Sequence, residues 1–371
     1  MSNSVNPSSL PPNNGKTLLI TGLSGYIAST IALLEGPYQL YASRISVLEV
    51  PDMTIQGAFD SAVQGVHAIF HTASPVNISN NSWATTIAPA IGGTNSLLNS
   101  AFTHAGPQLE ALIVTSSATT ASNPSAPPGA ILDEASWNIV ALATANEQGD
   151  STPPMVLYRA SKVAAERAVW EFRDQRKPPF AITTICPTYV IGPPIHLPHS
   201  PSHLNQTLAT VAKIFLGYEI EAAIGSGQFV DVRDVARLHI AAYEAGPAIS
   251  DGQRFFAIAG KGSPQAMADL LRDMYPERAA IIPTGEPGHD YVRVEMKDGR
   301  SWEVAYKEEQ EQLEGSHSNS RPLLRTSRDL VTRKYGAHKR NTSEQSEQSL
   351  DSFSWQYNFV TQDTLGITRR D

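Results

Sequence analysis

The chain of 371 residues is long enough for about two domains, and its composition, 41% hydrophobic and 17% charged residues, is typical of a folded protein with a full core. Its 28 basic and 36 acidic residues give a net charge of −8, which disfavours nucleic acid and anionic lipid as partners. The single cysteine, Cys186, excludes an intrachain disulfide and a cysteine-built zinc site, and without a membrane-length apolar run or a signal-peptide pattern we expect a cytoplasmic protein.

Strand and helix patterns alternate along most of the chain. Residues 1–15, rich in Ser, Asn and Pro, are predicted to be a disordered lead-in. Strands separated by helices are typical of βαβ units, so the sequence predicts an α/β fold, a doubly wound parallel sheet of the Rossmann type. The predicted strands are Thr17–Thr21, Ala68–His71, Ala111–Thr115 and Ala181–Cys186, and the predicted helices follow Gly25 and cover Ile91–Phe102 and Ser161–Gln175.

The composition changes after Cys186, where closely spaced prolines interrupt the pattern. We therefore assign residues 16–186 and 229–246 to a dinucleotide-binding domain, and residues 187–228 and 247–320 to a smaller substrate-binding lobe. Residues 321–371 are predicted to be a polar tail. Within it, Arg321–Arg340 holds seven basic residues and one acid, which indicates a solvated or disordered segment, with a basic contact surface as the alternative.

A glycine-containing turn follows the first predicted strand. The segment from Thr21 to Ala28, TGLSGYIA, has the spacing of a dinucleotide-binding turn. Gly22 allows a sharp exit from the strand, Gly25 lets a pyrophosphate approach the backbone, and the small Ala28 lets the helix pack on the sheet. The N–H groups of residues 25–27 would point at the phosphates from the positive end of the helix. A turn without a ligand could have this spacing, but the strand before it and the helix after it favour dinucleotide binding.

The residue that selects between NADP and NAD is expected about 20 residues further on, at the end of the second strand. Tyr38–Arg44 is the candidate strand, and the cation of Arg44 at its end favours NADP. An ordinary surface arginine is the alternative. Ile45–Val50 has the pattern of a third strand, yet neighbouring parallel strands need a crossover of about a dozen residues. The two runs are therefore either one strand or lack the helix between them.

Three polar residues predict a proton-transfer site. Tyr158 and Lys162 form a Y-x-x-x-K pattern, and one helical turn between them places both side chains on one face. An ammonium beside a phenol draws the tyrosine pKa down from about 10, so Tyr158 could protonate a carbonyl oxygen as hydride reaches the carbon. Ser117 follows a predicted strand at the edge where ligands bind open α/β sheets, and it could hydrogen-bond the same oxygen. Separately, these residues could be a surface pair and a turn serine; their order after the glycine turn disfavours chance.

Short segments spread over residues 16–290 carry a family resemblance. They are TGLSGYIA, VPD (50–52), GAFDSAVQGVHAIFHTASPV (57–76), VTSSA, DEASWN, YRASK, AAERAVWEF, PTYVIGP (187–193), HLN (203–205), FVDVRDVARLHI (229–240) and IPTGEPG (282–288). On these segments the chain resembles the extended short-chain dehydrogenases/reductases. Within them it is similar to the dihydroflavonol and cinnamoyl-CoA reductase branch, especially to fungal NADPH-dependent methylglyoxal and aldehyde reductases.

The resemblance implies a role for each matching position. Ser117 corresponds to the catalytic serine, Tyr158 to the proton donor and Lys162 to the lysine that also holds the ribose. Asp52 corresponds to the acid that contacts adenine. With the glycine turn and Arg44, the cofactor-binding set is Gly22, Ser24, Gly25, Tyr26, Ile27, Arg44, Asp52, Met53, Thr72, Ala73, Ser74, Tyr158, Lys162, Pro187 and Val190, and the substrate-pocket set is Val76, Ala118 and Tyr189.

The sequence therefore predicts an NADP(H)-dependent reductase of an aldehyde or ketone, with NAD(H) as the less favoured cofactor and with no metal, nucleic-acid or membrane partner. The alternatives are an NAD-dependent sugar-nucleotide epimerase or dehydratase and a non-catalytic dinucleotide-binding protein. The HTASP and DEASWN segments favour the reductase. The intact serine, tyrosine and lysine argue against a non-catalytic protein, whereas the helix missing after Arg44 would fit the decayed product of a damaged gene.

Overall fold

The computed structural model describes residues 15–23, 25–33, 45–74, 82–122, 130–195, 204–220, 227–262, 264–287 and 295–296. All of them belong to one compact unit that covers residues 1–327. The predicted lead-in, apart from Gly15, and the predicted tail 321–371 lie outside these ranges, so both stay predictions.

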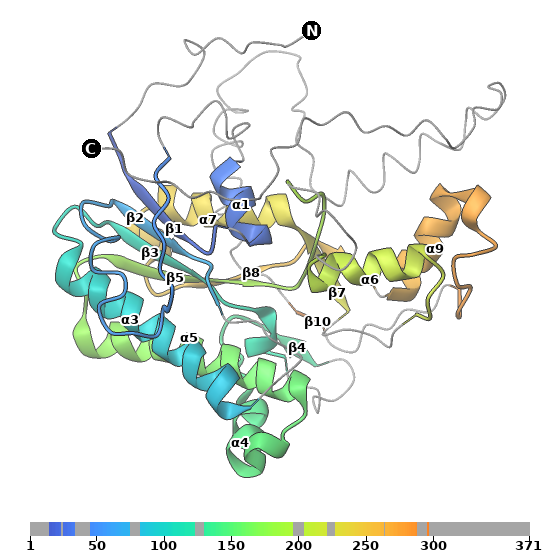
Figure 1. The fold of residues 1–371 in the computed structure, drawn as a ribbon, viewed down its shortest axis with the longest axis horizontal. Helices are drawn as coiled ribbons and strands as arrows, with labels where there is room; N and C mark the ends of the chain where they lie inside the picture. Colours follow the sequence, from blue (N-terminus) through green and yellow to red (C-terminus); the bar gives the residue numbers. More distant parts are fainter. Residues whose placement is uncertain are drawn as a thin grey trace, which may run out of the picture. The chain divides into compact units, whose positions relative to one another are not determined.

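The main sheet has five strands, all parallel to their neighbours, in the order β1-β2-β3-β5-β8 (Figure 1). The predicted α/β fold with a parallel sheet is therefore confirmed, and so are the four strands predicted within it. The strands are β1 (Leu18–Thr21), β2 (Ala68–His71), β3 (Ala111–Thr115), β5 (Ala181–Pro187) and β8 (Arg254–Ala257).

Helices cover both faces of this sheet (Figure 1). On one face lie α1 (Tyr26–Leu33) and α7 (Val232–Glu244), which contact each other. On the other face lie α3 (Ala88–His104) and α5 (Pro154–Arg176), and α4 (Ile139–Gln148) packs on α5. Shorter helical segments are η3 (Trp83–Ile87), η4 (Ala118–Thr120), η5 (Gly149–Ser151), α8 (Pro247–Ser250) and η7 (Pro276–Arg278).

Alternate residues of the central strands supply two separate cores. In β2, Ile69 belongs to the cluster under α3 and α5, and its neighbour Phe70 belongs to the cluster under α7. In β3, Leu112 belongs to the first of these clusters and Ile113 to the second. Side chains of a strand point alternately to the two faces, so a sheet covered on both faces needs apolar residues at consecutive positions. The nearly continuous apolar runs of these strands follow from that need.

A second region of the unit is built on a smaller sheet. Its strands β6 (Tyr189–Ile191), β7 (Gln228–Asp231) and β9 (Gly260–Lys261) pair in that order. Helices α6 (Gln206–Phe215) and α9 (Pro264–Met274) pack on each other through Ile214 and Ala268. Two further short strands, β4 (Ile131–Leu132) and β10 (Glu295–Met296), pair in parallel.

Two expectations on the chain's organisation are wrong. Residues 247–257, predicted to belong to the substrate lobe, lie with the main sheet, because β8 pairs with β5 and completes its edge. Ile45–Val50, predicted to be a third strand, forms none. Its Val47 and Leu48 are 73% and 60% exposed, as expected where no crossover helix brings the run beside a neighbouring strand. The preceding candidate strand, Tyr38–Arg44, lies outside the described residues.

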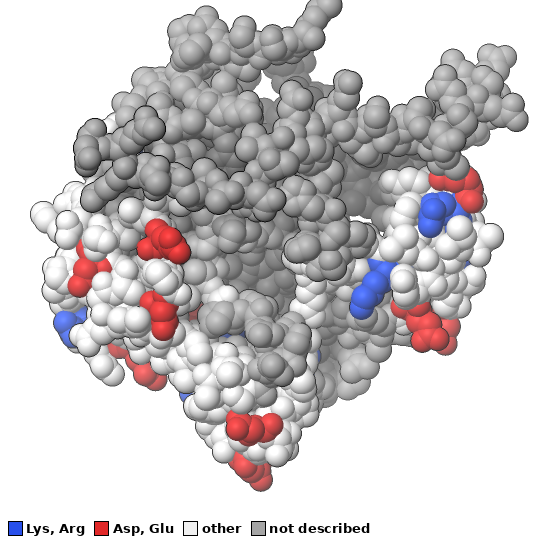
Figure 2. Space-filling view, in the orientation of Figure 1, with Lys and Arg blue, Asp and Glu red and all other residues white. Residues whose placement is uncertain are grey.

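No helix in the described ranges is both long and apolar enough to cross a membrane. On the face shown in Figure 2, the described acidic and basic side chains lie in separate small groups rather than in one continuous patch.

Candidate active site

The carboxyl ends of the strands bring the predicted site residues to one edge of the main sheet. One row of paired residues near this edge crosses all five strands and consists of Thr21, His71, Val114, Thr184 and Arg254. The glycine turn follows Thr21, and the turn that carries Ser117 follows β3. In open α/β sheets, ligands bind outside this edge.

The glycine turn has the geometry of a phosphate-binding turn. Gly22 has φ of +75°, and a Cβ there would lie 3.0 Å from the backbone of Ala73. The Gly25 N–H donates to the Gly22 carbonyl at 2.7 Å, and α1 begins at the next residue. Because Gly22 has no side chain, the turn and the loop after β2 lie in direct contact at the N-terminus of α1. The close backbone approach fits a dinucleotide pyrophosphate at the N-terminus of α1, although the Gly25 N–H, which was expected to point at the phosphates, donates within the turn.

The loop after β2 is fixed to the first strand by two hydrogen bonds. The Thr72 hydroxyl donates to the Thr21 carbonyl at 2.7 Å, and the Ala73 N–H donates to the Thr21 hydroxyl at 3.2 Å. The same hydroxyl contacts Nδ1 of His71 at 2.8 Å. The predicted cofactor loop Thr72–Ser74 therefore lies against the glycine turn.

Tyr26 links the glycine turn to the smaller sheet. Its hydroxyl donates to the carbonyl of Gly192, just after β6, at 2.5 Å. A Cβ at Gly192 would lie 3.0 Å from the Asp231 carboxylate, which Arg233 pairs at 2.7 Å. Burial raises the pKa of Tyr26, and the charge of Asp231 acts in the same direction. The side chain of Tyr26 thus has a structural role in addition to the backbone role predicted for it.

Ser117 lies in a tight turn directly after β3. Its hydroxyl caps the short helix η4 by accepting the Thr119 N–H at 3.2 Å, and it also accepts the Thr119 hydroxyl at 2.9 Å. The Ser117 side chain also lies near enough to the phenol of Tyr158 to favour its ionised form, and η4 contacts α5. The structure therefore brings together these two predicted site residues, which come from different elements.

Tyr158 and Lys162 both lie within α5, which begins at Pro154, earlier than predicted. Lys162 was expected to lower the pKa of Tyr158. Instead the pKa of Tyr158 is raised, because burial disfavours the phenolate by more than the nearby Ser117 hydroxyl favours it. The phenol therefore keeps its proton over the whole neutral range.

Lys162 is the group of the site that titrates nearest to neutral pH. Burial lowers its pKa to about 8, although the charge of Glu166 opposes this shift. The ammonium in turn adds to the effect of burial on His71, whose pKa falls to about 4. At neutral pH the site therefore holds a protonated lysine beside a neutral imidazole.

The other predicted site residues lie in several different elements. Asp52 is exposed and caps the Thr54 N–H at 2.8 Å, while Met53 packs on the core beneath α3. Pro187 ends β5 and pairs with Ala257. Ala118 is buried beside Cys186, and Val190 packs on the core beneath α7. Tyr189 is half-buried, and its hydroxyl lies 3.4 Å from the Thr207 carbonyl. Ser24, Arg44 and Val76 lie outside the described residues, and the roles of all these residues stay predictions.

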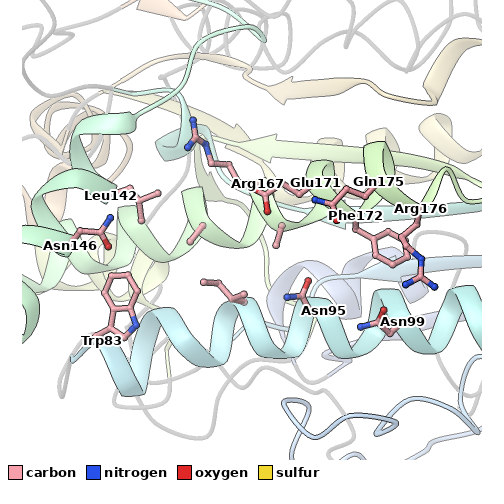
Figure 3. A pocket seen from close by; sticks show the side chains of 13 residues that line it. Trp83, Asn95, Asn99, Leu142, Asn146, Arg167, Glu171, Phe172, Gln175 and Arg176 are labelled. Atoms are coloured by element: carbon pink, nitrogen blue, oxygen red, sulfur yellow. The ribbon is translucent and has the colours of Figure 1, made fainter.

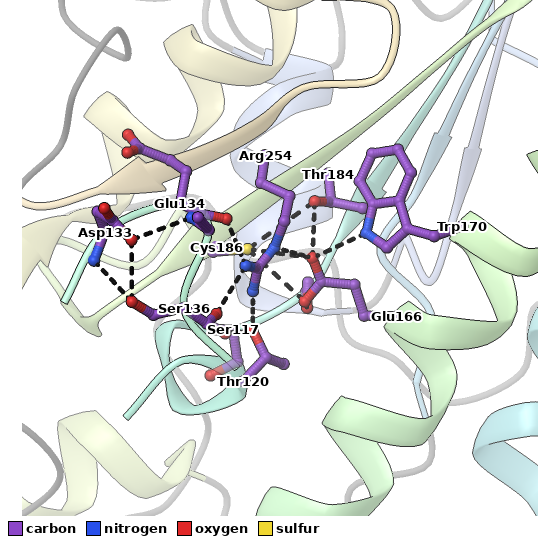
Figure 4. A network of polar contacts seen from close by, with 12 residues as sticks. Ser117, Thr120, Asp133, Glu134, Ser136, Glu166, Trp170, Thr184, Cys186 and Arg254 are labelled. Carbon is purple, nitrogen blue, oxygen red and sulfur yellow. Dashed lines mark hydrogen bonds and ion pairs between the residues drawn. The ribbon is translucent and has the colours of Figure 1, made fainter. Parts of the chain in front are cut away.

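A buried ion pair at this edge was missed by the sequence reasoning. Glu166, one helical turn after Lys162, pairs with Arg254 of β8 at 2.7 Å (Figure 4). The sequence did contain evidence for one partner of this pair, because Glu166 is a charged residue on the face of α5 that carries Tyr158 and Lys162. Its partner follows 88 positions later, and no local pattern connects the two.

A groove of about 550 Å³ lies elsewhere, between α3, α4 and α5 (Figure 3). Its lining includes Asn95 of α3, Asn146 of α4, and Arg167 and Glu171 of α5. At 3.6 residues per turn, these α5 positions lie on the opposite side of the helix from Lys162. The groove is therefore separate from the predicted site.

The chain matches one protein-family model and is similar to several known proteins and solved structures. Residues 18–257 match the model of the NAD dependent epimerase/dehydratase family. The ketoreductase azaE of Aspergillus niger is 33% identical over 305 residues, which cover 74% of this chain and 87% of the relative. Aldehyde reductase 2 of Sporidiobolus salmonicolor is 30% identical over 304 residues, covering 74% and 86%. The crystal structure of Gre2 from Candida albicans in complex with NADPH matches with a TM-score of 0.68 and 25% identity, covering 87% of this chain and 99% of that one.

Proposed function

The chain belongs to the NAD dependent epimerase/dehydratase family, and from this membership we propose that it is an NADPH-dependent reductase that converts an aldehyde or ketone to an alcohol. The observation that carries the proposal is the approach of Ser117, in the turn after β3, to Tyr158 on α5, with Lys162 one turn further along the same helix. The relatives add support, since they include a ketoreductase, an aldehyde reductase and the Gre2 protein crystallised with NADPH.

The chain's own residues would bind the cofactor and move one proton. The glycine turn and the loop Thr72–Ser74 would hold the pyrophosphate, and Lys162 the ribose next to the nicotinamide. NADPH, when bound, supplies the hydride for the carbonyl carbon. Tyr158 would donate its proton to the carbonyl oxygen, and its raised pKa keeps that proton in place beforehand. Ser117 would orient the same oxygen by a hydrogen bond.

The direct test follows the consumption of NADPH by its absorbance. The purified full-length chain is mixed with methylglyoxal, aliphatic aldehydes and aryl ketones, and with NADH in place of NADPH in parallel. We expect NADPH to be consumed with at least one of these carbonyl compounds. If the chain binds NADPH but reduces none of them, and instead converts a nucleotide-sugar, the epimerase or dehydratase alternative holds.

Lys162 is expected to set the alkaline limit of the reaction. Its pKa of about 8 means that the ammonium loses its proton as the pH rises through 8, whereas the pKa of Tyr158 is raised and lies outside this range. We therefore expect kcat/KM for the carbonyl substrate to be flat between pH 6 and 7, and to fall about tenfold per pH unit well above 8. A profile that stays flat to pH 10 would show that the charge on Lys162 is not required.

Arg44 is expected to select the cofactor. A guanidinium can contact the 2′-phosphate of NADP through charge-assisted hydrogen bonds, and hydrogen bonds to charged groups are worth roughly 1.5–3 kcal/mol. Arg44→Ala should therefore weaken NADPH binding by about 10- to 150-fold and leave NADH binding almost unchanged. Isothermal titration of the wild type and the variant with both cofactors measures this. Equal losses for the two cofactors, or no loss, would mean that the preference for NADP rests on another residue.

A further inference from the structure

The most extensively hydrogen-bonded carboxylate among the described residues is Glu166. Its side chain is fully buried. One oxygen, Oε1, accepts from Arg254 Nε at 2.7 Å, Thr184 Oγ1 at 2.9 Å and Trp170 Nε1 at 3.3 Å. The other, Oε2, accepts from Ser116 Oγ at 2.6 Å (Figure 4). A buried charge is tolerated only where it is paired and hydrogen-bonded, and this carboxylate has both.

Arg254 extends the pair to the turn after β3. Its Nη2 donates to the Thr120 hydroxyl at 2.9 Å, and Nη1 donates to the carbonyls of Glu134 and Ser136 at 2.6 and 2.8 Å. The Thr120 hydroxyl in turn donates to the Ser117 carbonyl at 2.8 Å. The guanidinium thus holds one end of the turn that carries Ser117.

Glu166 holds the other end of the same turn through Ser116, the residue before Ser117. Glu166 also lies on the face of α5 that carries Tyr158 and Lys162, because the three residues are spaced by four. The ion pair therefore connects the helix face that bears Tyr158 and Lys162 with both ends of the turn that bears Ser117.

We propose that the Glu166–Arg254 ion pair positions the proton-transfer site, by fixing the Ser117 turn against the face of α5 that carries Tyr158 and Lys162. Glu166 and Arg254 are positioning residues, which act through Ser117 and Lys162 and do not themselves contact the substrate. This inference rests on the proposed function, because it concerns the geometry of the same reaction.

The charge of Glu166 adds a second effect on the site. The charged and titratable groups around Lys162 are Tyr158 and Glu166 on α5, His71 on β2 and Cys186 on β5, with Arg254 of β8 beyond Glu166. Burial holds His71 neutral and raises the pKa of Cys186 to about 12. Glu166 is therefore the carboxylate among these groups that raises the pKa of Lys162.

The test is Glu166→Gln in the full-length chain, because glutamine keeps the shape and the Oε1 acceptor but removes the charge. Misplacing a reacting group by about 1 Å can cost 10²-fold, so we expect kcat to fall by about 10- to 100-fold. NADPH affinity, measured by titration, should fall much less than kcat, because the glycine turn and the loop Thr72–Ser74 are untouched and only the contact of Lys162 with the ribose is affected. The alkaline limb of the pH profile should move to lower pH, since Lys162 loses the carboxylate that raises its pKa.

Arg173→Gln is the matched control. Arg173 lies on the same helix and pairs with Asp251, shortly before β8, at 2.6 Å, so this variant breaks an ion pair between the same two parts of the chain, away from Ser117. It should lower stability while keeping kcat and the pH profile. If Arg173→Gln reproduces the effects of Glu166→Gln, or if Glu166→Gln folds and matches the wild type, the ion pair has only a structural role.

Two milder variants test the connection if Glu166→Gln does not fold. Ser116→Ala and Thr120→Val each remove one hydroxyl between the ion pair and the Ser117 turn. One hydrogen bond is worth about 0.5–1.5 kcal/mol, so each should lower kcat by about 2- to 13-fold with NADPH affinity unchanged. Wild-type kcat in both would overturn the inference. A wild-type chain that reduces no carbonyl compound would instead contradict the proposed function itself.

Discussion

Tyr158→Phe is expected to lower kcat for the carbonyl substrate by about 10²–10⁴-fold, the usual contribution of a positioned proton donor. The ring keeps its place in α5, so the site keeps its shape and loses only the hydroxyl that lies near Ser117. NADPH affinity should therefore stay close to that of the wild type. Steady-state kinetics at pH 7, together with titration of NADPH, measure both quantities.

Tyr243→Phe provides a matched control for this substitution. Tyr243 is also a partly buried tyrosine with a bonded hydroxyl, but its partners are Lys16 and Glu110, on a different part of the surface. It should keep wild-type kcat. If Tyr158→Phe retains more than about a tenth of wild-type turnover, another group donates the proton and the mechanism proposed above is wrong.

The features that the sequence predicts best depend on short stretches of chain. The glycine turn is set by Gly22 and Gly25 within a few residues, and the shared face of Tyr158 and Lys162 needs only one turn of helix. The parallel sheet follows from the alternation of strands and helices, and all four strands predicted for it are present. In each case the interactions that decide the structure lie within one element or between consecutive elements.

The features that the sequence does not predict depend on packing between distant segments. Ile45–Val50 has the composition of a strand, but it forms none, and Leu48 is largely exposed. Residues 254–257 were not predicted to be a strand of the main sheet. They form β8 there, paired in parallel with β5. The direction of the Tyr158 pKa shift depends on burial, a property of the folded chain that the Y-x-x-x-K pattern does not contain.

Arg254→Met is expected to destabilise the fold by about 3–5 kcal/mol, because it leaves the Glu166 carboxylate buried without its counter-ion. Two features of Arg254 support a loss of this size. Only 7% of its side chain is exposed, and the substitution also removes the donors to Thr120 and to the carbonyls of Glu134 and Ser136.

The measurement is reversible urea unfolding of the wild type and the variant, and Arg173→Met supplies the comparison. The Arg173–Asp251 pair is about as short, 2.6 Å, but its side chains are 30% and 34% exposed. Water therefore screens that pair, and its loss should cost only about 1 kcal/mol. Combining Arg254→Met with Glu166→Gln should restore part of the loss, because the double variant no longer buries an unpaired charge. If Arg254→Met costs no more than Arg173→Met, the buried pair does not hold the Glu166 side chain in place, and the positioning role proposed for the pair fails with it.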